Sequence, residues 1–570
     1  MPSSKPTHHR LALLAYAASA ICMSAHAADP VVDAGALLRQ TEQALKTPKK
    51  SPRLPARKAT PSPVKSGSTA TVQVNSFKFV GNTLISSDKL NSALATFTNR
   101  PLTLAQLQEA ANVATNIYRE AGWTVRAFLP KQEINSGIVS IQIVEAVFGS
   151  ATLQSATPQR IDAARLLDMA EANLVKGQPL HANDIDRTLL LLDDLPGVSV
   201  TGNLVAGQRD GETDLAITAA DEAWLTGNAS LDNQGSRSTG TERLSMNLSI
   251  NSPARMGDAL TLNALKTQGS DYQRAGYTVP VGYSGWRAGI NASHLNYDVL
   301  DSYQTNAGTH GTADTTGVDA SYPLIRSQLF NLNTSIAYAR KRFDNYAANL
   351  LSSNYKVSAS TLSLSGNQID NWGNGGITNA SIQFTSGNVD RTNSADFNSD
   401  QAANGLKTHG NYSKLSLSLS RLQTITSDLS FFAAATHQAA NKNLDSSEKI
   451  YLGGANGVRA YPSSEASGSE GHTFTAELRQ RLGPQWLLTG FYDFGRVNTN
   501  KNNYNAANPN GYNLQGYGTS VAWQGIQNVE IKATLSQRMG NNPAANSATG
   551  MDGDKTKKLT RIWLSTSIAF

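Results

Sequence analysis

The sequence predicts a transmembrane β-barrel of about 16 antiparallel strands, preceded by two small α+β domains and an N-terminal helix. Three observations lead to this fold class. The 570-residue chain opens on an export signal, and one order of helices and strands then occurs twice before residue 220. From residue 221 onward, helical patterns give way to short segments in which apolar and small polar residues alternate. Such alternation is typical of strands between lipid and a watery lumen.

The composition argues against a helical membrane protein and gives no sign of a nucleic-acid partner. The chain has 49 basic and 43 acidic residues, so its formal charge of +6 does not argue for a nucleic-acid partner. Beyond the N-terminus no apolar run is long enough for a membrane helix. A membrane barrel remains possible, because its strands bury only alternate residues and its mean hydropathy resembles that of a soluble protein.

Residues 1–27 are expected to be a secretory signal peptide. Its three parts follow in order: the bases Lys5 and Arg10, the apolar stretch Leu11–Met23 and the cleavage site Ala25–Ala27. A lipid anchor at Cys22 is disfavoured by the bulky Ile21 before it. Since Cys22 is the only cysteine, we expect a mature chain without disulfides or thiolate metal ligands.

Residues 28–46 are predicted to form a helix that plugs a pore. Asp33 is a suitable N-cap, and the helix runs to about Lys46 with one narrow apolar stripe. A frayed terminal helix is the alternative interpretation.

Residues 47–70 contain five prolines and six bases, a composition that cannot bury enough apolar surface to fold. Extended, this linker spans on the order of 70 Å, enough to let the helix leave its site. A basic arm for nucleic acid competes with this reading, but export argues against it.

Two α+β domains are predicted at residues 71–148 and 149–220. The first domain is predicted to consist of a strand, two helices and two strands in this order. Its longer helix is expected to begin with a capping box of Thr103 and Gln106. The second repeats the two helices and two strands. This order resembles the POTRA fold of periplasmic chaperoning modules. The resemblance implies an exposed strand edge and adjoining helix that capture an extended chain. Two structural domains without a ligand are the alternative.

The barrel is predicted over residues 221–570. At about 22 residues for each strand and its connections, this length accommodates about sixteen strands. A soluble β-sandwich also alternates, but it normally places larger apolar residues on its buried face. Five aromatic residues are expected to form girdles at the membrane interfaces: Trp224, Trp286, Tyr297, Trp486 and Trp563. Phe570 shares the parity of Ile562 and Leu564, as in the terminal strand of outer-membrane barrels.

A Gly- and Ser-rich segment near 451–471 is too long for a tight turn and is predicted to fold back into the lumen. Arg459 is its one cation, and Asp493 is the expected counter-charge. In the strand that follows, Phe491, Asp493 and Gly495 share one face. We therefore expect Arg459 and Asp493 to pair inside the barrel.

These residues resemble the outer-membrane transporters of two-partner secretion, the haemolysin secretion/activation proteins of the Omp85 superfamily. The resemblance covers nearly all of the mature chain, including the helix at 33–40, the linker, both repeats and the hairpin Leu231–Gly240. Its most specific parts are a loop motif and a strand motif, made of Gly457, Val458, Arg459, Ala460 and Tyr461, and of Phe491, Asp493 and Gly495. The family usually has glycine at position 460. If this position needs a positive φ, alanine costs on the order of 1 kcal/mol.

The resemblance implies a pore that recognises a large partner exoprotein in the periplasm and translocates it to the cell surface. The POTRA-like repeats would meet its unfolded N-terminal domain. The other implied partners are outer-membrane lipid and the barrel-assembly machinery that inserts the pore, with no nucleic acid and no cofactor. A barrel-assembly factor of the same superfamily is the alternative function. The sequence has no phosphate-binding loop, no His-Glu-x-x-His site and no Gly-x-Ser-x-Gly elbow, and we expect no enzyme activity.

Overall fold

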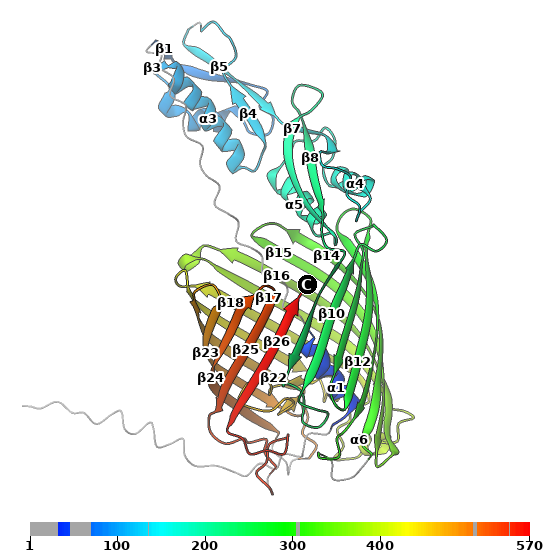
Figure 1. Cartoon of the computed structure of the whole chain (residues 1–570). Coiled ribbons are helices and arrows are strands. Elements are labelled where there is room, and N and C mark those ends of the chain that lie inside the picture. Colours follow the sequence, from blue (N-terminus) through cyan, green and yellow to red (C-terminus); the bar gives the residue numbers. More distant parts are fainter. Residues whose placement is uncertain (1–31, 46–69, 135, 304–307, 506–509, 547) are drawn as a thin grey trace, which may run out of the picture.

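The computed structural model describes residues 32–45, 70–134, 136–303, 308–505, 510–546 and 548–570. The predicted signal peptide and nearly all of the predicted linker lie outside these residues. In the described part, sixteen antiparallel strands close into a barrel, as the length of the C-terminal region predicts. Each strand pairs with its neighbour in the chain, and the last pairs with the first. Figure 1 shows two small domains at one end of this barrel.

The barrel strands are β9 (Leu225–Asp232), β10 (Arg243–Asn251), β11 (Ala259–Lys266), β12 (Ser270–Val281), β13 (Trp286–Asp298), β14 (His310–Arg326), β15 (Phe330–Ala347), β16 (Leu350–Asp370), β17 (Gly376–Asp390), β18 (Gly410–Thr424), β19 (Leu429–Ala440), β22 (Glu470–Leu482), β23 (Trp486–Asn498), β24 (Gly511–Ile526), β25 (Val529–Arg538) and β26 (Thr560–Ala569). Their connections hold η2 (Trp372–Asn374), α6 (Phe397–Gln401), η3 (Ser446–Glu448), β20 (Ile450–Tyr451) and β21 (Ser467–Gly468).

The strands alternate between an outward apolar face and an inward face, as predicted. Ile562, Leu564 and Phe570 all point outward and are exposed. The girdle prediction is wrong at two positions, because Tyr297 and Trp563 are buried on the inward face. The lumen is filled by a loop and a helix, so large aromatic side chains can pack inside it. Trp224, Trp286 and Trp486 are exposed, as a girdle requires.

The first small domain has a three-stranded sheet in the order β2-β5-β4, in which β2 (Ser76–Val80) runs parallel to β5 (Ile138–Glu145). Its other elements are β1 (Thr71–Val74), α2 (Ser87–Ala93), η1 (Ala95–Phe97), β3 (Arg100–Thr103), α3 (Leu104–Glu120) and β4 (Val125–Phe128). The capping box at the start of α3 forms as predicted. The sequence pattern missed β3, a four-residue strand that pairs with β1.

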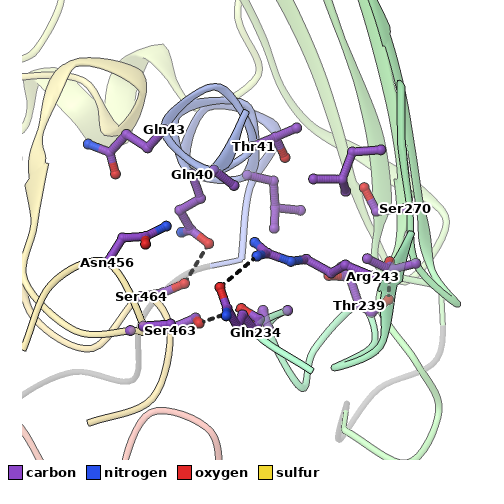
Figure 2. A pocket seen from close by; sticks show the side chains of 18 of the residues that line it. Gln40, Thr41, Gln43, Gln234, Thr239, Arg243, Ser270, Asn456, Ser463 and Ser464 are labelled. Carbon is purple, nitrogen blue, oxygen red and sulfur yellow. Dashed lines mark hydrogen bonds between the residues drawn. The ribbon is translucent and has the colours of Figure 1, made fainter. Parts of the chain in front are cut away.

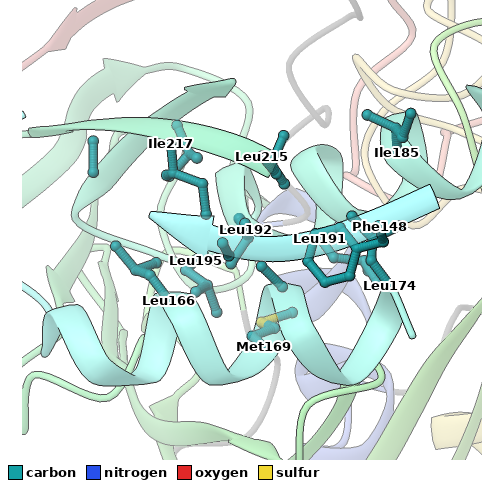
Figure 3. Close-up of a cluster of buried hydrophobic side chains, with 14 of the residues drawn as sticks. Phe148, Leu166, Met169, Leu174, Ile185, Leu191, Leu192, Leu195, Leu215 and Ile217 are labelled. Atoms are coloured by element: carbon teal, nitrogen blue, oxygen red, sulfur yellow. The ribbon is translucent and has the colours of Figure 1, made fainter. Parts of the chain in front are cut away.

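The second small domain has the same topology, with β6 (Val147–Leu153) parallel to β8 (Glu212–Asp221) and β7 (Val198–Ala206) antiparallel to it. Two helices, α4 (Ala163–Asn173) and α5 (Ala182–Asp193), cover the sheet. Figure 3 shows their shared core, to which Phe148 of β6 belongs. Sequence reasoning did not recognise β6. The expected domain boundary after residue 148 falls inside this strand, which pairs with β8 of the second domain.

The second domain is attached to three turns at its end of the barrel. Arg165 Nη2 donates to the carbonyl oxygens of Pro280 and Gly282, at 3.2 and 3.3 Å. Arg326 donates to both carboxylate oxygens of Asp194, at 2.7 and 2.9 Å. Further bonds join Arg187 Nη2 to the Pro323 carbonyl oxygen and Asp162 N to the Arg255 carbonyl oxygen. These contacts fix the direction in which the domain extends from the barrel.

The N-terminal helix α1 (Ala34–Ala44) lies inside the barrel, as Figure 1 shows. Asp33 caps it, accepting a hydrogen bond of 2.7 Å from Ala36 N. Its apolar face packs against inward residues of the barrel wall, including Leu295, Phe343 and Val357. The helix therefore belongs to a lumen core, and the frayed-terminus reading does not hold. Among the described residues, no helix has both the length and the apolar character needed to span a membrane.

Candidate functional site

The segment between β20 and β21 folds back into the barrel and forms a compact loop, residues 452–466, here named the lumen loop. β20 pairs with β21 at its base, and Val458 N donates to the Leu452 carbonyl oxygen at 2.7 Å. A Cβ atom on Gly457 would lie 1.9 Å from that same oxygen, so this tight turn requires glycine. Val458 is fully buried against the neighbouring loop and strand residues.

Arg459 at the tip of the loop reaches the inward face of β23. Its Nε and Nη2 donate to the two oxygens of Asp493, at 2.8 and 2.7 Å. Nη1 donates to Glu477 Oε1 at 2.8 Å, and the guanidinium carbon lies 3.5 Å from the centre of the Phe491 ring. Arg459 and Asp493 are 7% and 1% exposed, so water does not screen this pair.

The backbone of the loop tip is held as well. The carbonyl oxygen of Arg459 accepts hydrogen bonds from Ser536 Oγ at 2.7 Å and from Trp563 Nε1 at 2.8 Å. Asp493 also accepts from Arg459 N at 3.1 Å. Four strands therefore hold one residue: β22 through Glu477, β23 through Asp493, β25 through Ser536 and β26 through Trp563. The sequence pattern predicted only Asp493 and missed Glu477, Ser536 and Trp563. Trp563 could have been noticed, because it is a large apolar residue on a face where its strand otherwise has small or polar ones.

Ala460 has no positive φ, so the conditional cost of alanine at this position does not arise. Its side chain is 1% exposed and lies against β24. A Cβ atom on Gly516 would lie 2.4 Å from the Cβ of Ala460. Gly516 is opposite Asp493 in the register of β23 and β24. The missing side chain at Gly516 therefore makes the room that Ala460 occupies.

The other motif residues surround the same loop. A Cβ atom on Gly495 would lie 3.0–3.1 Å from the side chains of Leu452 and Val458, so glycine lets the loop approach the wall closely. Tyr461 is fully buried, and the guanidinium of Arg538 lies 4.6 Å from the centre of its ring. Phe570 lies apart from the loop. Its backbone exchanges hydrogen bonds of 2.8 and 2.9 Å with Gly227 of β9.

Glu465 connects the lumen loop to the connection between β25 and β26. Its two oxygens accept from Asn542 Nδ2 at 2.6 Å and from Gly553 N at 2.7 Å. Glu465 is 2% exposed, and burial raises the pKa of its carboxyl from 4.5 to about 7, with Asp552 and Asp554 adding to the rise. Its chain neighbours Ser464 and Ala466 both have positive φ, an uncommon conformation for these residue types. Nothing in the sequence pattern pointed to Glu465.

The helix α1 contacts the lumen loop directly, as Figure 2 shows. Ser464 Oγ donates to Gln40 Oε1 at 2.6 Å, and Ser463 Oγ donates to the Gln234 carbonyl oxygen at 2.8 Å. At the other end of the helix, Ser446 Oγ donates to Asp33 Oδ1 at 2.7 Å. Ala34 N donates to Asn345 Oδ1 at 2.8 Å. Loop, helix and wall therefore form one packed assembly inside the barrel.

A second buried charge cluster lies next to the start of α1. Glu448 of η3 pairs with Lys341 Nζ at 2.9 Å and with Lys414 Nζ at 2.7 Å. Burial opposes the ionisation of Glu448, but the two lysines outweigh it and lower the pKa of its carboxyl. The described residues contain no group of three or more His, Cys, Asp or Glu side chains placed to hold a metal ion.

Comparison with known proteins decides the family. Residues 211–522, more than half of the chain, match the model described as haemolysin secretion/activation protein ShlB/FhaC/HecB. The chain belongs to this family. Residues 72–146 match a second model, the POTRA domain of ShlB type. As a member of this family, the chain is an outer-membrane barrel with its POTRA domains in the periplasm.

Several similar proteins are transporters. The chain is 26% identical over 472 residues to the heme/hemopexin transporter protein HuxB of Haemophilus influenzae strain 86-028NP, covering 81% of this chain and 82% of that protein. It is 23% identical over 411 residues to the outer membrane transporter CdiB of Dickeya dadantii, covering 70% and 71%.

Among solved structures, CdiB from Escherichia coli has the same fold, with a TM-score of 0.69 at 20% identity over 95% of this chain and 100% of that chain. BamA from Haemophilus ducreyi, in a form lacking POTRA domains 1–3, resembles it less, with a TM-score of 0.51 at 13% identity over 88% and 100%. At these identities the likeness concerns the fold alone.

The contact between Ala460 and Gly516 predicts a rescue experiment. Gly516→Ala should destabilise the barrel by about 1–3 kcal/mol, because the new methyl group overlaps Ala460. Adding Ala460→Gly should recover part of this loss, since the Gln537 carbonyl oxygen still lies 2.9 Å from the new Cβ. Thermal unfolding in detergent measures the effect. Gly490→Ala on β23, where a Cβ meets nothing within 4 Å, is the matched control. Equal losses in the single and double variants would contradict the contact.

The raised pKa of Glu465 predicts a pH dependence of the loop anchor. Because the folded-state pKa of about 7 exceeds the unfolded value of 4.5, the unfolded state releases its proton first as pH rises. The free energy of unfolding of the loop anchor should therefore fall by about 3 kcal/mol between pH 4.5 and 7 and then stay constant. Hydrogen exchange of residues 539–546 against pH measures it. Glu465→Gln, which cannot ionise, should flatten the profile, and an unchanged slope would show that another group titrates.

Proposed function

We propose that this protein is the outer-membrane conduit of a two-partner secretion pathway, translocating a large partner exoprotein from the periplasm to the cell surface. Membership of the haemolysin secretion/activation family carries the assignment. The fold supports it through a sixteen-stranded barrel preceded by two POTRA-like domains, of which the second is attached to the barrel turns. The partner would be exported as an extended chain, because the lumen loop stays in the barrel and narrows the path.

The POTRA domains are proposed to receive the partner. The β2-β5-β4 sheet of the first domain leaves one strand edge free on each side, at β2 and at β4. An extended segment can add to such an edge by backbone hydrogen bonding, in a manner largely independent of side chains. The second domain is tied to the barrel turns by Arg165, Arg187 and Arg326, so a captured segment would be held close to the barrel entrance.

The helix α1 is proposed to close the resting pore. It fills the lumen through an apolar face and a few polar contacts at its ends. The lumen loop, by contrast, is anchored by a buried and multiply bonded guanidinium. We infer that the helix leaves during transport while the loop stays against the wall. The linker predicted at 47–70 is long enough to keep a displaced helix attached.

Barrel assembly is the alternative function within the superfamily. Its support is the resemblance to BamA, which is lower than that to CdiB in both TM-score and identity. The two POTRA domains of this chain and its family membership favour secretion.

The first test removes the anchor of the lumen loop. Arg459→Ala should abolish secretion of the partner, because it leaves Asp493 buried without its cation, at a cost of about 3–5 kcal/mol. Glu477 keeps its second partner, Arg479. Secreted partner is measured in the culture medium, and barrel insertion by the heat-dependent mobility of the protein on gels. Arg421→Ala is a matched control, since Arg421 makes a similar two-point contact with Asp370 away from the loop. Normal export by the Arg459 variant would refute the proposed role.

The second test removes the helix. Deleting residues 33–45 should raise basal ion conductance in planar bilayers severalfold while secretion continues, because the deletion vacates the lumen without disturbing the anchor of the loop. Gln40→Ala, which removes only the bond to Ser464, should change conductance little. If the deletion leaves conductance as it was, α1 is not the element that closes the pore.

A further inference from the structure

Three cationic side chains meet on the outward face of β15 and β16, towards the end of the barrel opposite the POTRA domains. Arg342 lies directly across from Lys356 in the register of the two strands, and Arg340 is two residues away on the same face. Directly opposed side chains have Cβ atoms about 4.5–5.5 Å apart, and like charges at that spacing destabilise a sheet. An anion between them would remove this repulsion.

Three carboxylates border this cluster, those of Asp314, Asp344 and Asp390, and they leave several of its N–H donors without a hydrogen-bond partner. Arg342 Nε donates to Asp344 at 3.0 Å, but its remaining donors have no partner in the described structure. Asp314 lies across from Arg342 on β14 and is engaged by His294 Nδ1 at 2.7 Å. Asp314 therefore places a negative charge along one side of the cluster.

Asp390 lies across from Lys356 on β17, and it accepts hydrogen bonds from the backbone and side chain of Thr392. Neither Arg340 nor Lys356 forms a hydrogen bond or ion pair with any residue that the structure describes. Both side chains are exposed. The cluster therefore presents two cations without a hydrogen-bonded partner among the described residues, of which Lys356 attracts Asp390 electrostatically, and one guanidinium bonded through Nε alone.

The cluster stands directly above the apolar band of the barrel. The next outward row towards the periplasm holds Val318 and Tyr338, and the row below it holds Ile336 and Leu362. All four are exposed large hydrophobic residues. Aromatic residues such as Tyr338 mark the level of lipid headgroups. The cations thus lie at the headgroup level of the outer leaflet.

An apolar hollow of about 780 Å³ lies beside the cluster, on the outer face of β10 to β14. Leu244, Met246 and Leu262 line it. Asp314 and Thr316 also line it, and these two residues lie directly across from Arg342 and Arg340. The hollow gives an acyl chain room next to a headgroup held by the cations.

We propose that Arg340, Arg342 and Lys356, with the adjoining hollow, form a binding site for a phosphorylated glycolipid of the outer leaflet. Arginine pairs bind phosphate oxygens at two points each, and lysine adds a third charge. The hollow favours a lipid over a free anion, since leucine and methionine side chains make up much of its lining beside a smaller polar part that includes Asp271 and Asp314. The site lies on the outside of the barrel wall, so it is separate from the transport path and does not depend on the proposed cargo.

The test measures binding of lipid A to the full chain in neutral detergent by native mass spectrometry. The triple variant R340Q/R342Q/K356Q should bind lipid A more weakly, by roughly fivefold for each charge removed. The single variant K356Q should bind lipid A about fivefold more weakly. It replaces the triple variant in the test if the triple variant does not fold. K78Q/K89Q/K176Q, which removes three exposed lysines of the POTRA domains, should bind like the unmodified protein.

Two further probes distinguish the lipid from other anions. Dephosphorylated lipid A should bind the unmodified protein and the triple variant equally weakly. Inorganic phosphate at the same concentration should not displace lipid A. The proposal fails if the triple variant retains full affinity, if dephosphorylated lipid A binds as tightly as lipid A, or if inorganic phosphate competes in the same range. None of these readouts involves secretion, so they stand apart from the test of transport.

Discussion

The buried guanidinium of Arg459 is the constraint on which the interior of this barrel depends. A charge removed from water must be paired and hydrogen-bonded, and here two carboxylates and an aromatic face meet that requirement. Replacing such a pair by apolar residues is often neutral for stability, so its value is better sought in position than in energy. Four strands hold this one residue, and the loop has one place in the lumen as a result.

That fixed loop gives the rest of the lumen its order. The helix α1 rests on it through Gln40 and Ser464, and the β9–β10 hairpin meets it at Ser463. Glu465 extends the same assembly to the connection after β25. The interior is thus a packed core in which a buried guanidinium anchors the loop, while apolar packing and a few hydrogen bonds hold the helix. This difference suits a pore that must open to a polypeptide while keeping its register with the wall.

The two domains on the periplasmic side are also held by hydrogen bonds. The second POTRA domain is fixed to the barrel turns by arginines that donate to carbonyl oxygens and to Asp194. Hydrogen bonds between backbones join the two domains, from Thr124 N to the Leu180 carbonyl oxygen and from Ala182 N to that of Gly122. The two domains are therefore joined to each other and to the barrel by hydrogen bonds.

Much of this architecture could be predicted from the sequence, because its causes are local. Alternation of apolar and polar residues specifies a strand with two faces, and the number of residues bounds the number of strands. The capping box at Thr103 and the cap at Asp33 also form where their residue types predict. Arg459 and Asp493 could be nominated as a pair because a lone cation in a small-residue loop needs a counter-charge.

Only the tertiary structure decided what surrounds that pair. Glu477, Ser536 and Trp563 reach Arg459 from strands that are separated from it in the chain, and no local pattern marks their meeting. The same holds for Gly516, whose missing side chain matters because Ala460 occupies its space. Alternation indicates that a residue faces inward, but the closure of sixteen strands and their register determine what it faces.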